Sequence, residues 1–88
     1  MRVYDSNIYG NWKHRENGRL YHFRKCGVIV FSENSQKVFM FKIETKNEFS
    51  TLVFPDTKQR FPFVVMCHNY FSVRNNAGKI LTLDKLIE

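Results

Sequence analysis

Short segments rich in Phe, Tyr, Val and Ile alternate with polar turn residues through most of the chain. The apolar segments are Leu20–Arg24, Val28–Phe31, Gln36–Ile43, Phe49–Phe54, Arg60–Cys67, Tyr70–Val73 and Lys79–Leu83. Short runs of this composition, separated by turn residues, are typical of consecutive β-hairpins. The pattern predicts an all-β domain, a small and mostly antiparallel meander of about seven to eight strands that closes into a barrel or a strongly bent sheet.

Alternation within these segments predicts which side chains face the interior, because successive side chains of a strand point to opposite faces of the sheet. Tyr21 and Phe23 share one face of their segment, and Phe39 and Phe41 share one face of theirs. The residues expected to line the interior, or a ligand site within it, are Trp12, Tyr21, Phe23, Phe39, Phe41, Leu52 and Phe54. Val38 and Met40 lie on the opposite face and are also apolar, which predicts a strand covered on both sides.

Three local features refine this picture. Asn17-Gly18 predicts a two-residue type I′ turn, because both central residues of that turn need positive φ. Pro62 lies within a strand segment and cannot donate to a ladder, so that strand is expected to start at an edge or to carry a bulge. Residues 1–9 are expected to form an N-terminal arm or a first strand of a single domain that spans residues 1–88.

Size and composition favour one domain with a dense aromatic core. The chain has 88 residues, among them nine Phe, four Tyr and one Trp. A small domain buries a limited share of its surface, and aromatic rings contribute large buried areas. No apolar run is long enough to span a membrane, and the N-terminus lacks the apolar stretch of a secretory signal. These features predict a cytoplasmic protein without a membrane segment.

The net charge of +6 favours acidic partners. One basic stretch is opposed locally only by Glu16 and consists of Lys13, Arg15, Arg19, Arg24 and Lys25. This basic hairpin is interpreted in two ways: as a patch for phosphate or an acidic protein surface, or as a solvated face that keeps a Phe-rich protein soluble.

No arrangement of residues indicates catalysis or metal binding. Cys26 and Cys67 do not make a disulfide framework, and the sequence leaves open whether they are reduced or bridged. Cys67 and His68 are adjacent, so in a strand their side chains point to opposite faces and cannot form a nucleophile–base pair. Metal-ligand spacings and phosphate-binding loops are absent. The chain is therefore expected to be a non-enzymatic protein without a metal or cofactor.

Several short motifs resemble small lipocalin-like domains. These are Gly10-Asn11-Trp12, then Tyr21-His22-Phe23 before Gly27, then Phe41-Lys42-Ile43, and finally Leu81-Thr82-Leu83. The resemblance implies an up-and-down barrel that holds an apolar ligand or serves as a binding scaffold. The chain is shorter than a full lipocalin, so its barrel is expected to be filled largely by its own side chains.

A second resemblance is to the polo box. Residues 28–35 are similar to a strand–turn stretch of that family, and residues 48–61 are similar to its next hairpin. The chain departs from the family because residues 63–73 predict further strand where a polo box ends in a long helix. This resemblance implies peptide binding or dimerisation.

Two functional hypotheses follow, both for a protein that binds without catalysis. The first is a lipocalin-like module that engages a protein partner or a small apolar ligand, with a homodimer through Val38 and Met40 as one form of it. The alternative is a small basic inhibitor-type protein, like those of phages, that binds nucleic acid or a nucleic-acid-handling complex through the basic hairpin. Nucleic-acid binding would weaken steeply with salt, whereas binding of an apolar ligand would hardly respond.

Overall fold

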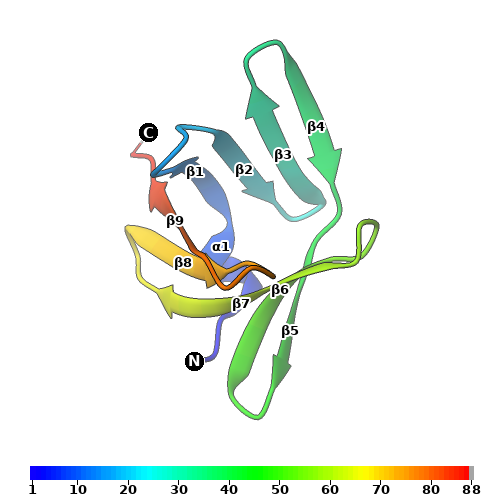
Figure 1. Cartoon of the computed structure of the whole chain (residues 1–88), viewed down its shortest axis with the longest axis vertical. Coiled ribbons are helices and arrows are strands. Elements are labelled where there is room, and N and C mark those ends of the chain that lie inside the picture. Colours follow the sequence, from blue (N-terminus) through cyan, green and yellow to red (C-terminus); the bar gives the residue numbers. More distant parts are fainter. Residues whose placement is uncertain (88) are drawn as a thin grey trace.

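The computed structural model describes residues 1–87, in which a run of hairpins curls into one half-barrel sheet (Figure 1). Within these residues a one-turn helix, α1 (Asp5–Ile8), precedes nine strands: β1 (Gly10–His14), β2 (Leu20–Arg24), β3 (Gly27–Ser32), β4 (Ser35–Phe39), β5 (Lys42–Lys46), β6 (Phe49–Phe54), β7 (Gln59–Met66), β8 (Tyr70–Arg74) and β9 (Ile80–Lys85). All strand pairs are antiparallel. The predicted all-β, strongly bent meander is confirmed.

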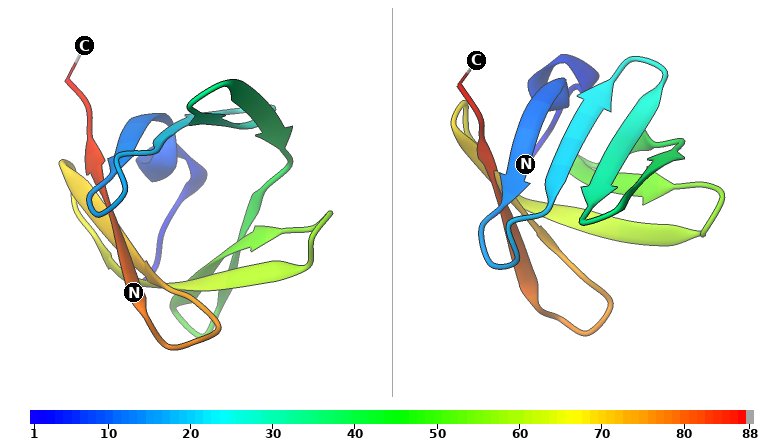
Figure 2. Two further views of the ribbon diagram at one scale, coloured as in Figure 1. Left: turned by 45° about the horizontal axis from the view of Figure 1, so that its top comes forward. Right: turned by 90° about the horizontal axis from the view of Figure 1, so that it is seen from above.

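The strand order explains why the sheet curls around one interior. The order is β4-β3-β2-β1-β9-β8-β7-β6-β5, so the first strand of the chain pairs with the last. The two edges, β4 and β5, are consecutive in the chain and are not paired with each other. Figure 2 shows the strands arranged around a common centre. The sheet is therefore a half-barrel whose two edge strands, β4 and β5, follow each other end to end along the chain and do not pair.

The predicted strand at 36–43 is in fact divided into β4 and β5 by Met40 and Phe41. This break accounts for the additional strand. Phe41 still points inward, and its ring centroid lies 5.1 Å from that of Phe23. Phe39 and Ile43 also pack against the core, so the inward–outward alternation continues across the break. Because inward and outward side chains alternate without a change across the break, the sequence pattern could not reveal it.

The turn prediction at Asn17-Gly18 is wrong. The loop from β1 to β2 is longer, because the His14 backbone N donates to the Arg19 O at 2.8 Å and Gly18 N donates to the His14 O at 2.9 Å. Only Gly18 of the two residues has a positive φ, of 74°. The two-residue turn instead joins β5 to β6, where Asn47 and Glu48 have φ values of 51° and 71°. Positive φ at both central residues is the signature of a type I′ turn.

The bulge expected near Pro62 is confirmed. Pro62 lies opposite Thr51 in the β6–β7 ladder, and the β7–β8 register shifts between Phe63 and Val65. β7 lies between two neighbours rather than at an edge, so the ladder must accommodate a residue that cannot donate. The irregularity falls directly after the proline.

The N-terminal residues form an arm rather than a first strand. Val3 is buried, and its backbone N donates to the Ser50 Oγ at 2.7 Å. Ser50 N in turn donates to the Met1 O at 3.0 Å. The arm then turns through α1, which places Ile8 in the core. The arm therefore ties the β6 strand to the start of β1.

Trp12 forms the centre of the core. Its side chain is fully buried, its Nε1 donates to the Ile8 O at 2.8 Å, and its ring meets Phe71 edge-on with centroids 4.7 Å apart. The Lys85 Nζ lies 4.7 Å from the centroid of the Trp12 ring and donates to the Tyr9 O at 2.9 Å. The Lys85 side chain can pass over the Trp12 ring because Gly10 has no side chain. A Cβ at position 10 would lie 2.5 Å from the Lys85 Nζ.

We predict that Trp12→Phe lowers the free energy of unfolding by about 1–3 kcal/mol, because it removes the indole donor from a buried carbonyl and leaves unfilled volume. Urea unfolding followed by circular dichroism measures the change. Phe49→Leu is the control, since Phe49 is 70% exposed and its substitution should change stability by less than about 0.5 kcal/mol. Equal stability of the Trp12→Phe variant and the original chain would contradict this account of the core.

His14 is a buried histidine that accepts hydrogen bonds. Its Nδ1 faces the backbone N of Glu16 at 3.2 Å and of Asn17 at 3.3 Å. Burial lowers the pKa of His14 below its ordinary value of 6.5, because desolvation disfavours the charged imidazolium, and Lys79 and Arg19 act in the same direction. Glu16 opposes this shift and does not outweigh it. The folded state therefore favours neutral His14.

We predict that the free energy of unfolding decreases as the pH is lowered from about 7.5 to about 5, because the unfolded chain then binds a proton that folded His14 resists. Urea unfolding at a series of pH values measures the slope. His14→Gln should flatten it, because the variant lacks the imidazole whose charging the fold resists. A slope that survives His14→Gln would assign the effect to another group.

Candidate functional site

The open side of the half-barrel contains an apolar cleft. Residues from β2, β3 and β4 form one wall, and residues from β6, β7 and their connecting loop form the other. The lining consists of Arg19, Tyr21, Val30, Phe39, Phe54, Thr57, Gln59 and Phe61, around a volume of about 210 Å³. We call this space the side cleft. Its floor is aromatic, and its polar groups lie at the rim.

Aromatic contacts close the line where backbone pairing stops. Phe39 of β4 meets Phe54 of β6 edge-on, with ring centroids 6.4 Å apart. Phe54 also meets Phe61 edge-on at 5.7 Å. The two walls therefore contact each other through side chains rather than through a hydrogen-bond ladder. Ring contacts of this kind can separate without breaking strand pairing.

A much smaller space, the inner cavity, lies beneath the side cleft. Its volume is about 70 Å³, and it shares Tyr21, Phe54 and Phe61 with the cleft above. Pockets for drug-sized ligands typically have volumes of about 300–1,000 Å³. The inner cavity is therefore too small for such a ligand, and the side cleft above it offers the larger apolar space.

A polar space adjoins the side cleft. It is lined by Arg19, Val30, Ser32, Ser35, Lys37 and Phe39, has a volume of about 250 Å³, and shares Arg19, Val30 and Phe39 with the cleft. We call it the cationic hollow. Lys37 lies opposite Val30 in the β3–β4 register, which places both on the inner face of the sheet. The main chain of Arg19 is anchored on both sides, since its N donates to the Asn17 Oδ1 at 2.8 Å and its O accepts from His14 N at 2.8 Å.

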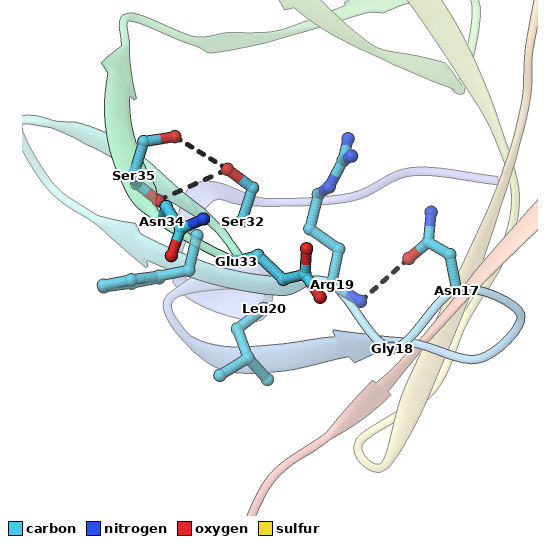
Figure 3. Close-up of a pocket in the computed structure, with 9 residues that line it drawn as sticks. Asn17, Gly18, Arg19, Leu20, Ser32, Glu33, Asn34 and Ser35 are labelled. Carbon is cyan, nitrogen blue, oxygen red and sulfur yellow. Dashed lines mark hydrogen bonds between the residues drawn. The ribbon is translucent and has the colours of Figure 1, made fainter.

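A third space runs along the end of the half-barrel between the β1–β2 and β3–β4 turns (Figure 3). It holds about 730 Å³ and is bordered by residues 17–20 and 31–35. Most of these residues are exposed, and the hydroxyls of Ser32 and Ser35 bond to each other at 2.8 Å. Figure 3 shows the Arg19 side chain extending between the two turns. The groove is a wide surface depression, which Arg19 connects to the side cleft.

The residues predicted to line the interior occupy two layers. Trp12, Phe23 and Leu52 are buried in the core, while Tyr21, Phe39, Phe41 and Phe54 are partly buried and pack against it. Tyr21, Phe39 and Phe54 line the side cleft, whereas Phe41 does not. Phe61 and Val30 were not among the predicted site residues. Phe61 lies opposite Leu52, so the β6–β7 register would have identified it.

The five predicted patch cations do not form one cluster. Arg19 precedes β2 and lines the side cleft, whereas Arg24 and Lys25 lie at the far end of β2 beside Asn11. Arg24 Nη2 donates to the Asn11 Oδ1 at 2.8 Å. Arg15 Nη2 lies 2.6 Å from the Asp84 Oδ1, and Lys13 lies opposite Leu20 on the outer face. Only Arg19 of the five belongs to the candidate site.

Acidic residues are distributed unevenly over the strands. The strands β1 to β4 contain no Asp or Glu. Glu44 of β5 is bound by Arg60 at 2.8 Å and Lys42 at 3.0 Å, and the hydrogen bond from Arg60 is the main cause of its lowered pKa. Asp84 of β9 likewise has a lowered pKa because it accepts a hydrogen bond from Arg15. The two acids of β5 to β9, Glu44 and Asp84, are therefore each paired with a cation.

Other chemistry is sparse in the part of the chain that the structure describes. Cys26 is exposed and Cys67 is half-buried, and both are free thiols, which settles the question that the sequence left open. Among residues 1–87 no three His, Cys, Asp or Glu side chains lie together in a way that could hold a metal ion. None of the helices in this range is long and apolar enough to cross a membrane.

The curled meander agrees with the barrel that the lipocalin-like resemblance implies. Membership of that family, or of the polo box family, stays a prediction. No known protein family, curated protein or solved structure matches the chain.

Proposed function

We propose that the chain is a non-enzymatic binding protein that takes a small apolar ligand into the side cleft. The observation that carries this proposal is the aromatic lining of the cleft between the β4 edge of the sheet and the β6–β7 hairpin, which no strand pairing joins. Concave sites with mostly apolar walls and a few polar groups at the rim are the usual form of small-molecule sites.

The volume of the cleft sets the size of the ligand. A cavity of about 150 Å³ can hold benzene. The side cleft, of about 210 Å³, suits a single ring with a short substituent or an alkyl chain of similar bulk. A larger ligand would have to separate Phe39 from Phe54, whose contact spans the opening.

We predict that the uncharged probe 3-phenylpropan-1-ol binds in the side cleft, because its ring replaces water against Tyr21, Phe54 and Phe61. A titration followed by two-dimensional NMR should shift the backbone signals of these residues and of Val30. Val30→Phe fills the cleft and should abolish the shifts, whereas Val38→Phe on the outer face of the neighbouring strand should preserve them. Circular dichroism is the check that both variants are folded.

A ligand response located on the outer face, or one that Val30→Phe leaves intact, would overturn the proposal. The nucleic-acid alternative receives less support, because the five patch cations are divided between the ends of β2 and the outer face. Its own test is binding of oligonucleotides at low salt, with a steep decrease in affinity as salt is raised.

A second candidate is a homodimer through β4. Val38 is 67% exposed and Met40 is 54% exposed, and β4 is an edge strand whose outward backbone groups are not paired in the sheet. Edges of this kind can add a strand from another chain. A second copy of β4, running antiparallel, would cover both features at once.

For this candidate, light scattering at rising protein concentration should show a dimer. Val38→Lys should lower the apparent association constant at least about 10-fold, because a buried charge without a partner is costly. Phe49→Lys is the control, since Phe49 is equally exposed but lies on β6, away from the β4 edge. A monomer at all concentrations, or equal effects of the two substitutions, would exclude the dimer.

A further inference from the structure

The inner face of β2, β3 and β4 changes from polar to apolar along the strands. Its outermost part carries Arg19, Ser32, Ser35 and Lys37, which line the cationic hollow. The strand register then places Tyr21 opposite Val30, and Val30 opposite Lys37. The next row inward is Phe23, Val28 and Phe39, of which Phe23 and Val28 are fully buried.

We propose that the ligand of the side cleft is a small organic anion with an apolar body and one carboxylate or comparable group. Its anionic end would lie in the cationic hollow at Arg19 and Lys37, and its body would lie between Val30, Phe54 and Phe61. This inference rests on the proposed function, because it specifies the ligand class of the same cleft.

The two cations are available to an external anion. Among residues 1–87 the ion pairs are Arg15–Asp84, Lys42–Glu44, Arg60–Glu44 and Lys79–Glu16, so neither Arg19 nor Lys37 takes part in one. Both side chains are exposed. An arginine can present two parallel N–H donors to a carboxylate, and a lysine adds a mobile point charge on a long stem.

The walls of the two spaces carry no negative charge. The lining of the side cleft and of the cationic hollow includes no Asp or Glu. At the opposite rim, Thr57 and Gln59 are neutral, and the Gln59 Oε1 already faces the Thr57 Oγ1 at 3.4 Å. The nearest acid in the adjoining groove is Glu33, in the β3–β4 turn, and it lines neither space.

The concave placement of these cations favours a small molecule over a polymer. Arg19 and Lys37 are on the inner face, next to a cleft of about 210 Å³ that holds one ring-sized body. A nucleic-acid backbone needs a row of accessible cations along a surface, and the remaining basic residues of the predicted patch do not continue such a row.

The test compares 3-phenylpropionate with 3-phenylpropan-1-ol, which differ in the anionic group and share the apolar body. NMR titrations with the full chain give both dissociation constants. We expect tighter binding of the carboxylate, by about 2- to 5-fold for each cation that contacts it. The double variant R19Q/K37Q should lose this preference, so that the two dissociation constants become equal. Added salt should weaken the binding of the carboxylate and leave the binding of the alcohol unchanged.

A matched double variant controls for net charge. K46Q/R74Q also removes two exposed cations, from β5 and β8, neither of which lines the cleft or the hollow. It should keep the preference for the carboxylate. Glu33→Gln should strengthen carboxylate binding slightly, because it removes the acid at the adjoining groove.

The outcomes separate this inference from the proposed function. If both probes bind equally and R19Q/K37Q changes nothing, the anion inference is overturned while the apolar cleft stands. Equal effects of K46Q/R74Q and R19Q/K37Q would also overturn it, because the preference would then reflect overall charge. If neither probe binds, the proposed function itself fails. If 3-phenylpropionate shifts only the NMR signals of the outer-face cations Lys13 and Arg24, the carboxylate binds as a nonspecific ion. That result would contradict both proposals.

Discussion

The pairing of the first strand with the last is the constraint on which the fold depends. β1 and β9 join the four-stranded half of the sheet to the five-stranded half, with Trp12 opposite Lys85. The main chain extends the junction, since Leu86 N donates to the Asn11 O at 2.9 Å. Gly10 permits the crossing of Lys85 over the Trp12 ring, so the glycine and the tryptophan of the Gly10-Asn11-Trp12 motif act together. This junction orders the two ends of the chain at once.

Closure at the chain ends determines where the barrel is open. Because strand pairing runs from β4 through β1 and β9 to β5, the edge strands of the described sheet are β4 and β5. Where β4 meets β6 without strand pairing, the Phe39 and Phe54 rings are in contact. The side cleft is therefore a consequence of strand order, because its two walls meet there through ring contacts and not through strand pairing. An aromatic opening of this kind suits the binding role that we propose.

The sequence was informative where a local rule decides the outcome. β2 and β6 have the predicted bounds, and Phe23 and Leu52 are buried as the alternation indicated. Prediction failed where distant residues decide. The β6–β7 register brings Phe61 opposite Leu52, and no short stretch of sequence indicates this pairing. The basic stretch illustrates the same limit, because each strand residue advances the chain by about 3.3 Å and so places Arg19 and Arg24 at opposite ends of β2. The cations were predicted to form one patch because they are close in the sequence, but the strand separates them in space.

Charge and concavity coincide on the same half of the sheet. The two acids on β5 to β9 are paired, Glu44 with Arg60 and Asp84 with Arg15 of the β1–β2 loop, whereas β1 to β4 contain no strand acid to cancel Lys37. An excess of positive charge spread over the whole surface would attract many anions weakly. Two cations on an inner face, with aromatic rings beyond them, select for molecules that carry both an anionic group and an apolar body. Discrimination then comes from requiring both features in one small ligand, since a simple salt lacks the body and a hydrocarbon lacks the charge.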